Sequence, residues 1–206
     1  HHQKVIEEAP AECLTASTHE KLLDTARIAA KKLHYTGAGT MEFLLADPTH
    51  FYFMEMNTRI QVEHPITELT SGIDLVKWQI KIAAGEKLPP ALPHPLAGFA
   101  LECRINAQTA GQITGLHLPG GWGIRVDTAI YQGYLIPPNY DAMIAKIIAY
   151  GSDRQTVIQR MRMALDETVI SGINTNLDFL LQLLTEPDYL QLKADINWLD
   201  QLTQTN

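Results

Sequence analysis

Two runs of alternating residues, TMEFLLA (residues 40–46) and FYFMEMN (residues 51–57), flank the segment DPTH and constrain the fold most strongly. Strand-like runs separated by a few turn-forming residues are typical of a β-hairpin. The second run continues as EMNTRIQVEHP, in which every second residue is polar. These residues are Glu55, Asn57, Arg59, Gln61 and Glu63. Because alternate side chains of an extended strand share a face, the sequence predicts a hairpin with one strongly polar face.

The length of the loop predicts which residues of the two strands lie opposite each other. If DPTH is a regular loop, Ala46 pairs with Phe51 and Glu42 pairs with Glu55. Cross-strand partners have Cβ atoms about 4.5–5.5 Å apart, and two like charges there are destabilising. A cation between the carboxylates would remove this repulsion, and Asn57 would lie beside them. Such an oxygen-donor set suits Mg²⁺ or Mn²⁺.

Two interpretations of the polar face stay open at this point. A row of charges is most often a solvated surface, and an amphipathic hairpin would explain it. Against this, regular alternation places Phe51 and Phe53 on the Glu55 face, which would then change from apolar to polar as a pocket wall does. Arg59 and Glu63 add a cation and a further base. An arginine beside a metal pair suits a phosphate or carboxylate ligand.

The rest of the chain predicts an α+β protein in two parts. Before the hairpin we expect a strand over residues 4–8 and a helix opened by STHE (residues 17–20), which fits a capping box. After it we expect one helix from Pro65 toward Gly85. The proline-rich residues 88–95 resemble a linker, because proline disrupts helices.

Beyond this linker the pattern changes to short strands separated by glycine and proline turns. They are expected within residues 98–107, 111–119, 123–130 and 143–150. A helix opened by Ser152 or Asp153 should follow, then another from Asn174 and one or two short ones. We therefore expect two domains, residues 1–90 and residues 91–206.

Composition excludes several classes of protein. Hydrophobic residues make up 46% and charged residues 19%, as in ordinary soluble domains. The net charge of -7 argues against bulk attraction to nucleic acid or to an anionic membrane. No run is apolar and long enough to span a bilayer. The two cysteines, Cys13 and Cys103, have neither metal-type nor redox-type spacing, so we expect a reducing, cytoplasmic location.

The segment EMNTRIQVEHPITE resembles the signature of biotin carboxylases, the ATP-grasp component of biotin-dependent carboxylases. Many ATP-grasp enzymes share E-x-N-x-R, but the continuation QVEHP is characteristic of the biotin-dependent group. HHQKVIEEAP, GAGTMEF, ALECRINA and YDAMIAKIIAYG resemble other family segments, so the resemblance covers nearly the whole chain. It implies the C-terminal part of an ATP-grasp domain over residues 1–90, then a biotin carboxylase C-terminal domain over residues 91–206. Each is expected to be an antiparallel sheet with helices.

The resemblance also implies a reaction and its participants. ATP, with Mg²⁺ or Mn²⁺, would react with bicarbonate to give carboxyphosphate, and biotin on a carrier protein would be carboxylated from it. The implied partners are the biotin carboxyl carrier protein, a carboxyltransferase component and a second copy of the chain. The nearest member is the biotin carboxylase of bacterial acetyl-CoA carboxylase, which serves fatty acid synthesis.

Family motifs carry individual roles onto this sequence. They assign the metal to Glu42, Glu55 and Asn57, and the nucleotide to His2, Glu42 and Glu55. They assign bicarbonate to Lys4, Arg59 and the backbone of Val62. Glu63 would be the general base on bicarbonate, Arg59 a catalytic cation, and Arg104 the arginine that stabilises the enolate of biotin.

The sequence departs from the family in two places. The family's N-terminal α/β domain and its lid with a glycine-rich loop have no counterpart here, and the loop after Ala107 is shorter. Two functions therefore stay open: part of a working biotin carboxylase, or a non-catalytic module that keeps the fold and the dimer surface. A different ATP-grasp ligase is disfavoured by QVEHP and ECRIN.

Overall fold

The computed structural model describes residues 4–89 and 98–204. The chain divides into two compact units, and each is described by itself. Ala9–Ala97 form what we call the hairpin unit, whereas His1–Glu8 and Gly98–Asn206 together form the C-terminal unit. Most of the proline-rich segment lies outside the described residues. The predicted domain boundary at residue 90 therefore stays a prediction.

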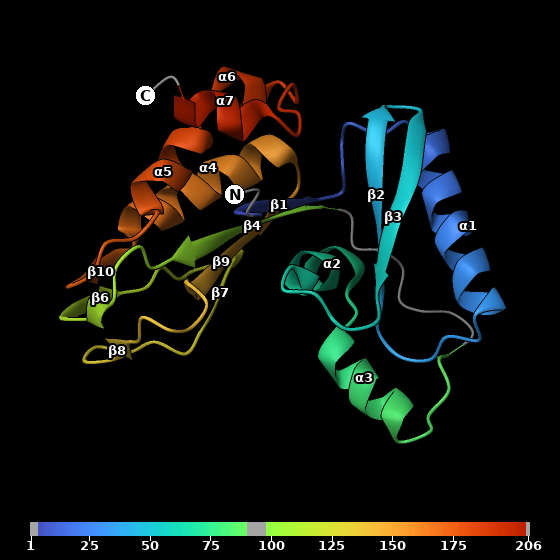
Figure 1. Cartoon of the computed structure of the whole chain (residues 1–206), viewed down its shortest axis with the longest axis horizontal. Helices are drawn as coiled ribbons and strands as arrows, with labels where there is room; N and C mark the ends of the chain where they lie inside the picture. Colours follow the sequence, from blue (N-terminus) through green and yellow to red (C-terminus); the bar gives the residue numbers. More distant parts are fainter. Residues whose placement is uncertain (1–3, 90–97, 205–206) are drawn as a thin grey trace. The chain divides into compact units, whose positions relative to one another are not determined.

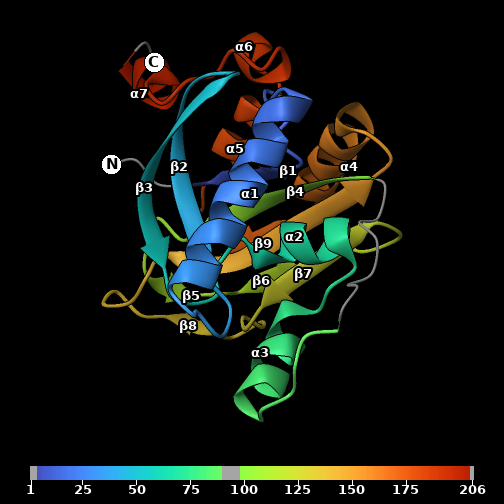
Figure 2. The same cartoon turned by 90° about the vertical axis from the view of Figure 1, so that its right-hand side faces the viewer.

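The hairpin unit contains a two-stranded antiparallel sheet and helices (Figures 1 and 2). Its elements are α1 (Ala16–Lys32), β2 (Thr40–Asp47), β3 (His50–Asn57), α2 (His64–Ser71) and α3 (Leu75–Ala83). Helix α1 runs beside the hairpin in both views. The hairpin predicted from residues 40–57 is thus confirmed.

Helix α1 begins earlier than its sequence suggests. Its N-cap is Thr15, whose hydroxyl oxygen accepts the Thr18 N–H at 3.1 Å, so the capping box predicted at Ser17 is wrong. The reason is tertiary, because the Thr18 hydroxyl donates to the Pro48 carbonyl in the hairpin turn at 2.8 Å. Thr18 is only 2% exposed, so the start of the helix is fastened to the turn.

The single helix expected from Pro65 toward Gly85 is two helices. Helix α2 ends at Gly72, which has φ of 70° and a left-handed conformation that glycine adopts without strain. Asp74 then caps α3 by accepting the Lys77 N–H at 2.8 Å. The Glu68 carboxylate accepts the Leu75 N–H at 2.8 Å and so links the two helices. A glycine stop and a new cap explain the break.

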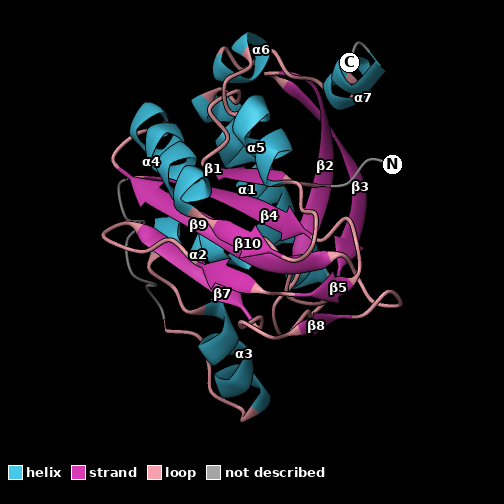
Figure 3. Cartoon of the chain, turned by 90° about the vertical axis from the view of Figure 1, so that its left-hand side faces the viewer, coloured by secondary structure: helices cyan, strands magenta, loops and turns pink. Residues whose placement is uncertain are grey.

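The C-terminal unit is built on a four-stranded sheet with the order β1-β4-β9-β7. These strands are β1 (Ile6–Ala9), β4 (Phe99–Asn106), β9 (Met143–Gly151) and β7 (Ile124–Thr128). Helices α4 (Arg154–Glu167) and α5 (Leu177–Leu183) lie on one face of this sheet (Figure 3). The core between them includes Cys103, Ile105, Ile147, Met161 and Leu180, all fully buried.

Short pairs of strands and two more helices complete this unit. They are β5 (Gly111–Gln112) with β8 (Leu135–Ile136), β6 (Gly115–His117) with β10 (Val169–Ser171), α6 (Pro187–Leu190) and α7 (Trp198–Gln204). Each of the four predicted strand regions contains a strand, and Asp153 caps α4 as expected. The α+β class is therefore confirmed. Within the described ranges, no helix combines the length and apolarity that crossing a membrane requires.

Candidate functional site

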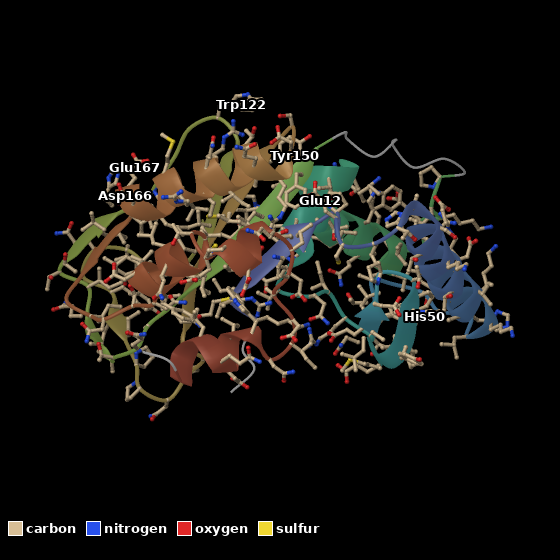
Figure 4. All side chains as sticks on the ribbon, turned by 90° about the horizontal axis from the view of Figure 1, so that it is seen from above. Glu12, His50, Trp122, Tyr150, Asp166 and Glu167 are labelled. Atoms are coloured by element: carbon tan, nitrogen blue, oxygen red, sulfur yellow. The ribbon has the colours of Figure 1, made fainter. Side chains whose placement is uncertain are left out.

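Glu42 and Glu55 are direct cross-strand partners, as the sequence predicted. The route to this pairing differs from the expected one. Asp47 pairs with His50 (labelled in Figure 4) across a tighter turn, and Phe51 pairs with Leu45 instead of Ala46. The ladder shifts once between Leu45 and Asp47 and again between Glu42 and Phe43. Because an extra residue on one strand offsets an extra residue on the other, the glutamates still meet.

The same shifts correct the predicted position of the aromatic residues. Phe43 pairs with Phe53, and their ring centroids lie 5.9 Å apart; Phe43 and Phe51 are 5.4 Å apart. Because Phe43 directly follows Glu42, these rings lie on the face opposite the carboxylates. The expectation that Phe51 and Phe53 share the Glu55 face is therefore wrong, because the extra residue Met54 reverses the alternation.

Asn57 joins the two carboxylates. Its Nδ2 donates to Oε1 of Glu42 at 3.1 Å and to Oε1 of Glu55 at 3.0 Å. Among the residues that the structure describes, no group of three or more His, Cys, Asp or Glu could hold a metal ion. The predicted set is instead two carboxylates and an amide, brought together by their own hydrogen bonds. The carboxylate oxygens are hard donors that suit Mg²⁺ or Mn²⁺. Nδ2 of Asn57 faces these carboxylates, whereas its Oδ1 accepts from Arg59.

Arg59 and Gln61 extend this network along the polar row. The Arg59 guanidinium donates to Oδ1 of Asn57 at 3.4 Å and to Oε1 of Gln61 at 3.0 Å. Gln61 in turn donates to Oε1 of Glu42 at 3.2 Å. Gln61 had no predicted role, although its place in the polar row was a signal that could have suggested one. It connects the cation of the site to one of the paired carboxylates.

Val62 and Glu63 lie where the extended segment turns into α2. Glu63 is the N-cap residue, and the helix begins with His64 and Pro65. Nδ1 of His64 lies 2.8 Å from the Gln61 carbonyl oxygen, and this contact helps to order the turn. Helix N-termini attract anions, so this position suits residues that bind an anion.

The other predicted residues belong to the C-terminal unit. Arg104 lies on β4, where its guanidinium is 2.6 Å from Oε1 of Glu7, with 16% and 9% of the two side chains exposed. Its carbonyl accepts Nδ2 of Asn176 at 3.0 Å. Lys4 is exposed just before β1, and His2 lies outside the described residues.

Other charged side chains share with Arg104 the sheet face opposite α4 and α5. Lys146 is the direct partner of Arg104 on β9 and of Asp127 on β7, and its Nζ lies 3.5 Å from Oδ2 of Asp127. Burial raises the pKa of Asp127, but hydrogen bonds and charge from Arg125, together with Lys146, outweigh burial and hold that pKa below its usual value. Across this face two cations, Arg104 and Lys146, therefore lie side by side, with Glu7 and Asp127 on their outer sides.

Comparison with known proteins gives consistent matches along the chain. The family model described as carbamoyl-phosphate synthase L chain, ATP binding domain, matches residues 1–91, and that of the biotin carboxylase C-terminal domain matches residues 102–201. The biotin carboxylase of Nostoc sp. is 44% identical, over 98% of this chain and 47% of the relative. A pyruvate carboxylase component of Methanothermobacter thermautotrophicus is 49% identical, over 86% of this chain and 38% of the relative.

A solved structure agrees with these relatives. The biotin carboxylase domain dimer of Hydrogenobacter thermophilus 2-oxoglutarate carboxylase, in complex with MgADP, ADP and bicarbonate, superposes with a TM-score of 0.94. It is 41% identical, over 98% of this chain and 47% of that chain. The present chain thus spans about half the length of the proteins it matches.

Proposed function

The chain belongs to the biotin carboxylase family, and from this premise we propose that it supplies part of a site that carboxylates biotin with ATP and bicarbonate. The network Glu42–Asn57–Glu55, with Arg59 attached to it, carries the proposal. It places carboxylate oxygens that could bind a divalent metal ion beside Arg59, whose positive charge could bind an anionic substrate. Such a combination suits phosphoryl transfer to bicarbonate.

Each part of this network has a role in the proposed chemistry. Glu42, Glu55 and Asn57 would hold Mg²⁺ or Mn²⁺, and the ion, when bound, neutralises phosphate oxygens of ATP. Arg59 would bind bicarbonate through its planar fork and orient it toward the γ-phosphorus. Holding the substrates in line accounts for much of the rate acceleration in reactions of this type.

The remaining residues act on bicarbonate and on biotin. Lys4 and the backbone of Val62 would complete the bicarbonate site, and Glu63 would accept the bicarbonate proton as an oxygen attacks ATP. The products of that step are carboxyphosphate and ADP, and carboxyphosphate then breaks down to phosphate and the CO₂ that carboxylates biotin. Arg104 would stabilise the enolate oxygen that develops on biotin before its N1′ is carboxylated. His2 would contact the nucleotide together with Glu42 and Glu55.

The proposal extends to partners and to cellular role. We assign biotin on a carboxyl carrier protein as the acceptor, a carboxyltransferase as the next component, and a homodimer as the assembly. Because relatives include a pyruvate carboxylase component, membership of the family alone does not determine which molecule finally receives the carboxyl group. We propose the acetyl-CoA carboxylase of fatty acid synthesis, in the cytoplasm.

A chimera tests the proposed function. The part of the Nostoc relative that precedes the match is joined to this chain, and ATP hydrolysis dependent on bicarbonate and biotin is measured. The chimera should be active, whereas the chain alone should show no appreciable activity. Glu55→Gln and Arg59→Ala should each lower kcat about 100-fold, because each removes a preorganised charge.

Glu20→Gln is the matched control, because Glu20 is an exposed carboxylate of α1 in the same unit. It should leave the rate unchanged. Full activity in the two site variants would refute the assignment of the network. An inactive chimera that is folded would favour the non-catalytic module instead.

A further inference from the structure

Two successive glutamates of β1 hold arginines on opposite faces of the C-terminal sheet. Oε1 of Glu7 lies 2.6 Å from the Arg104 guanidinium. Glu8 accepts Nε and NH2 of Arg154, both at 2.9 Å, in a two-pronged ion pair. Because successive side chains of a strand point to opposite faces, Arg154 is held on the face that α4 and α5 cover, and Arg104 on the opposite face. Strand β1 therefore carries both ion pairs.

Arg154 is itself fixed by neighbours other than Glu8. Its guanidinium donates to the carbonyls of Leu190 at 3.1 Å and Tyr189 at 3.0 Å, and its central carbon lies 4.8 Å from the centroid of the Tyr189 ring. The Tyr189 hydroxyl also donates to Glu8, and Trp198 stacks on the Tyr189 ring. Arg154 is 7% exposed and Tyr189 is 9% exposed. A buried fork of this kind fixes the position of the carboxylate that it binds.

The backbone of β1 alone gives the strand little support. It is a four-residue strand at the edge of the sheet, with β4 as its one neighbour in the strand order. The Arg104 N–H donates to the Val5 carbonyl at 3.0 Å just before the strand. Short edge elements with few ladder bonds open locally more readily than central strands. The buried bonds of Glu8 therefore help to keep β1 in place, together with the packing of Ile6 against the core.

The position of β1 matters to Arg104 because another cation lies on its other side. Lys146 is the direct cross-strand partner of Arg104 on β9. Like charges directly opposite each other repel, so each needs an acid on its far side. Asp127 supplies one for Lys146 at 3.5 Å, and Glu7 supplies one for Arg104. If β1 moves, the ion pair between Glu7 and the Arg104 guanidinium is weakened.

We propose that Glu8, Arg154 and Tyr189 are positioning residues for Arg104, and that they act through β1 and Glu7. The proposal rests on the role of Arg104 toward biotin stated above. It predicts that residues on the sheet face covered by α4 and α5 influence a guanidinium on the opposite face without touching it. A purely structural ion pair would stabilise the fold but would leave the Glu7–Arg104 bond unaffected.

A double-mutant cycle on the 206-residue chain distinguishes these cases. The unfolding equilibrium constant is measured by urea denaturation for Glu7→Gln, Arg154→Lys and the double variant. Arg154→Lys keeps the charge and loses the fork. If Arg154 positions β1, the effect of Glu7→Gln should be at least about fivefold smaller in the Arg154→Lys background, since coupled sites are non-additive. Effects that multiply within about twofold would overturn the proposal, because independent sites behave in that way.

Two further variants make the cycle decisive. Tyr189→Phe removes only the hydroxyl that donates to Glu8, so it gives the same comparison if Arg154→Lys does not fold. Arg162→Lys changes an exposed arginine of α4 and should show independent effects with Glu7→Gln.

The active chimera gives a functional measurement of the same link. Arg154→Lys and Tyr189→Phe should lower kcat for biotin carboxylation and leave the KM for ATP unchanged. Unchanged kcat alongside a coupled cycle would overturn the positioning role. If the unsubstituted chimera does not carboxylate biotin, the proposed function fails, whereas the cycle still decides whether the two faces are linked.

Discussion

Glu55→Gln should stabilise the chain when divalent cations are absent and should remove its stabilisation by Mg²⁺. The two carboxylates are direct cross-strand partners, and one amide nitrogen donates to an oxygen of each. Without a cation between them, the negative charges repel. Glutamine keeps the shape of the side chain and an acceptor for Asn57, but it removes one charge.

The size of this effect follows from the geometry. Because a single nitrogen donates to both, at 3.1 and 3.0 Å, the two oxygens lie within about 6 Å of each other. Two unit charges at that distance repel by about 0.7 kcal/mol in water and about 2.8 kcal/mol at an effective dielectric constant of about 20. Glu55 is exposed, so the lower value applies. We expect Glu55→Gln to raise the free energy of unfolding by about 0.5–1 kcal/mol.

Mg²⁺ should make the unsubstituted chain more stable than the Glu55→Gln variant. At ten times its dissociation constant, an ion that binds only the folded chain adds about 1.4 kcal/mol to the free energy of unfolding. The unsubstituted chain should gain this amount and the variant should gain little. Urea denaturation at low ionic strength, first with EDTA and then across a Mg²⁺ titration, measures both effects. Added salt should shrink the difference seen in EDTA, because exposed charges are screened.

Glu20→Gln again serves as the control, because it removes one exposed negative charge from the same unit without altering the pair. It should change the free energy of unfolding by less than about 0.5 kcal/mol. The reasoning is refuted if Glu55→Gln in EDTA is no more stable than this control. It is also refuted if Mg²⁺ stabilises the variant as much as the unsubstituted chain.

Two further predictions concern side-chain interactions that stabilise the C-terminal unit and the hairpin unit. Asp127→Asn should destabilise the chain at neutral pH. The pKa of Asp127 is lower in the folded chain than in the unfolded chain. The ionised carboxylate therefore stabilises the fold fully above about pH 4, and this stabilisation is lost as pH falls through the folded pKa. The difference in stability between the variant and the unsubstituted chain should shrink in acid. A difference independent of pH would contradict this. Thr18→Val should cost about 1–3 kcal/mol in urea denaturation, because it removes the buried donor to the Pro48 carbonyl. Thr25→Val, on the exposed side of α1, should cost much less, and equal costs would argue against the fastening of helix to turn.

The hairpin shows how far sequence patterns could predict the site. Alternation and a turn signal located the strands, and they paired Glu42 with Glu55 correctly. They could not locate the two extra residues, because a bulge depends on packing and hydrogen bonding across the strands rather than on composition. The position of Phe53 was therefore predicted on the wrong face, while the glutamate pair was unaffected because the two shifts offset each other.

The C-terminal unit shows what sequence patterns could not predict. Its strand regions and the cap of α4 were predictable from local signals. That β1 joins β4 was not, because the two strands are separated in sequence by the whole hairpin unit. The same separation hid the ion pairs of Glu7 and Glu8, since their partners lie far along the chain. Local patterns predict elements, whereas long-range charge pairing needs the fold.

The two adjacent glutamates of β1 also select the register of this strand in the sheet. If β1 slid by one residue along β4, either Glu8 would replace Glu7 opposite Arg104 or Glu7 would replace Glu8 opposite Arg154. In the first case Ala9 would face Arg154, and in the second Ile6 would face Arg104. After either slip, one arginine still faces a glutamate and the other does not. Loss of the carboxylate partner is costly for a buried cation. The two ion pairs therefore favour one alignment of this short edge strand, because only that alignment satisfies both charges.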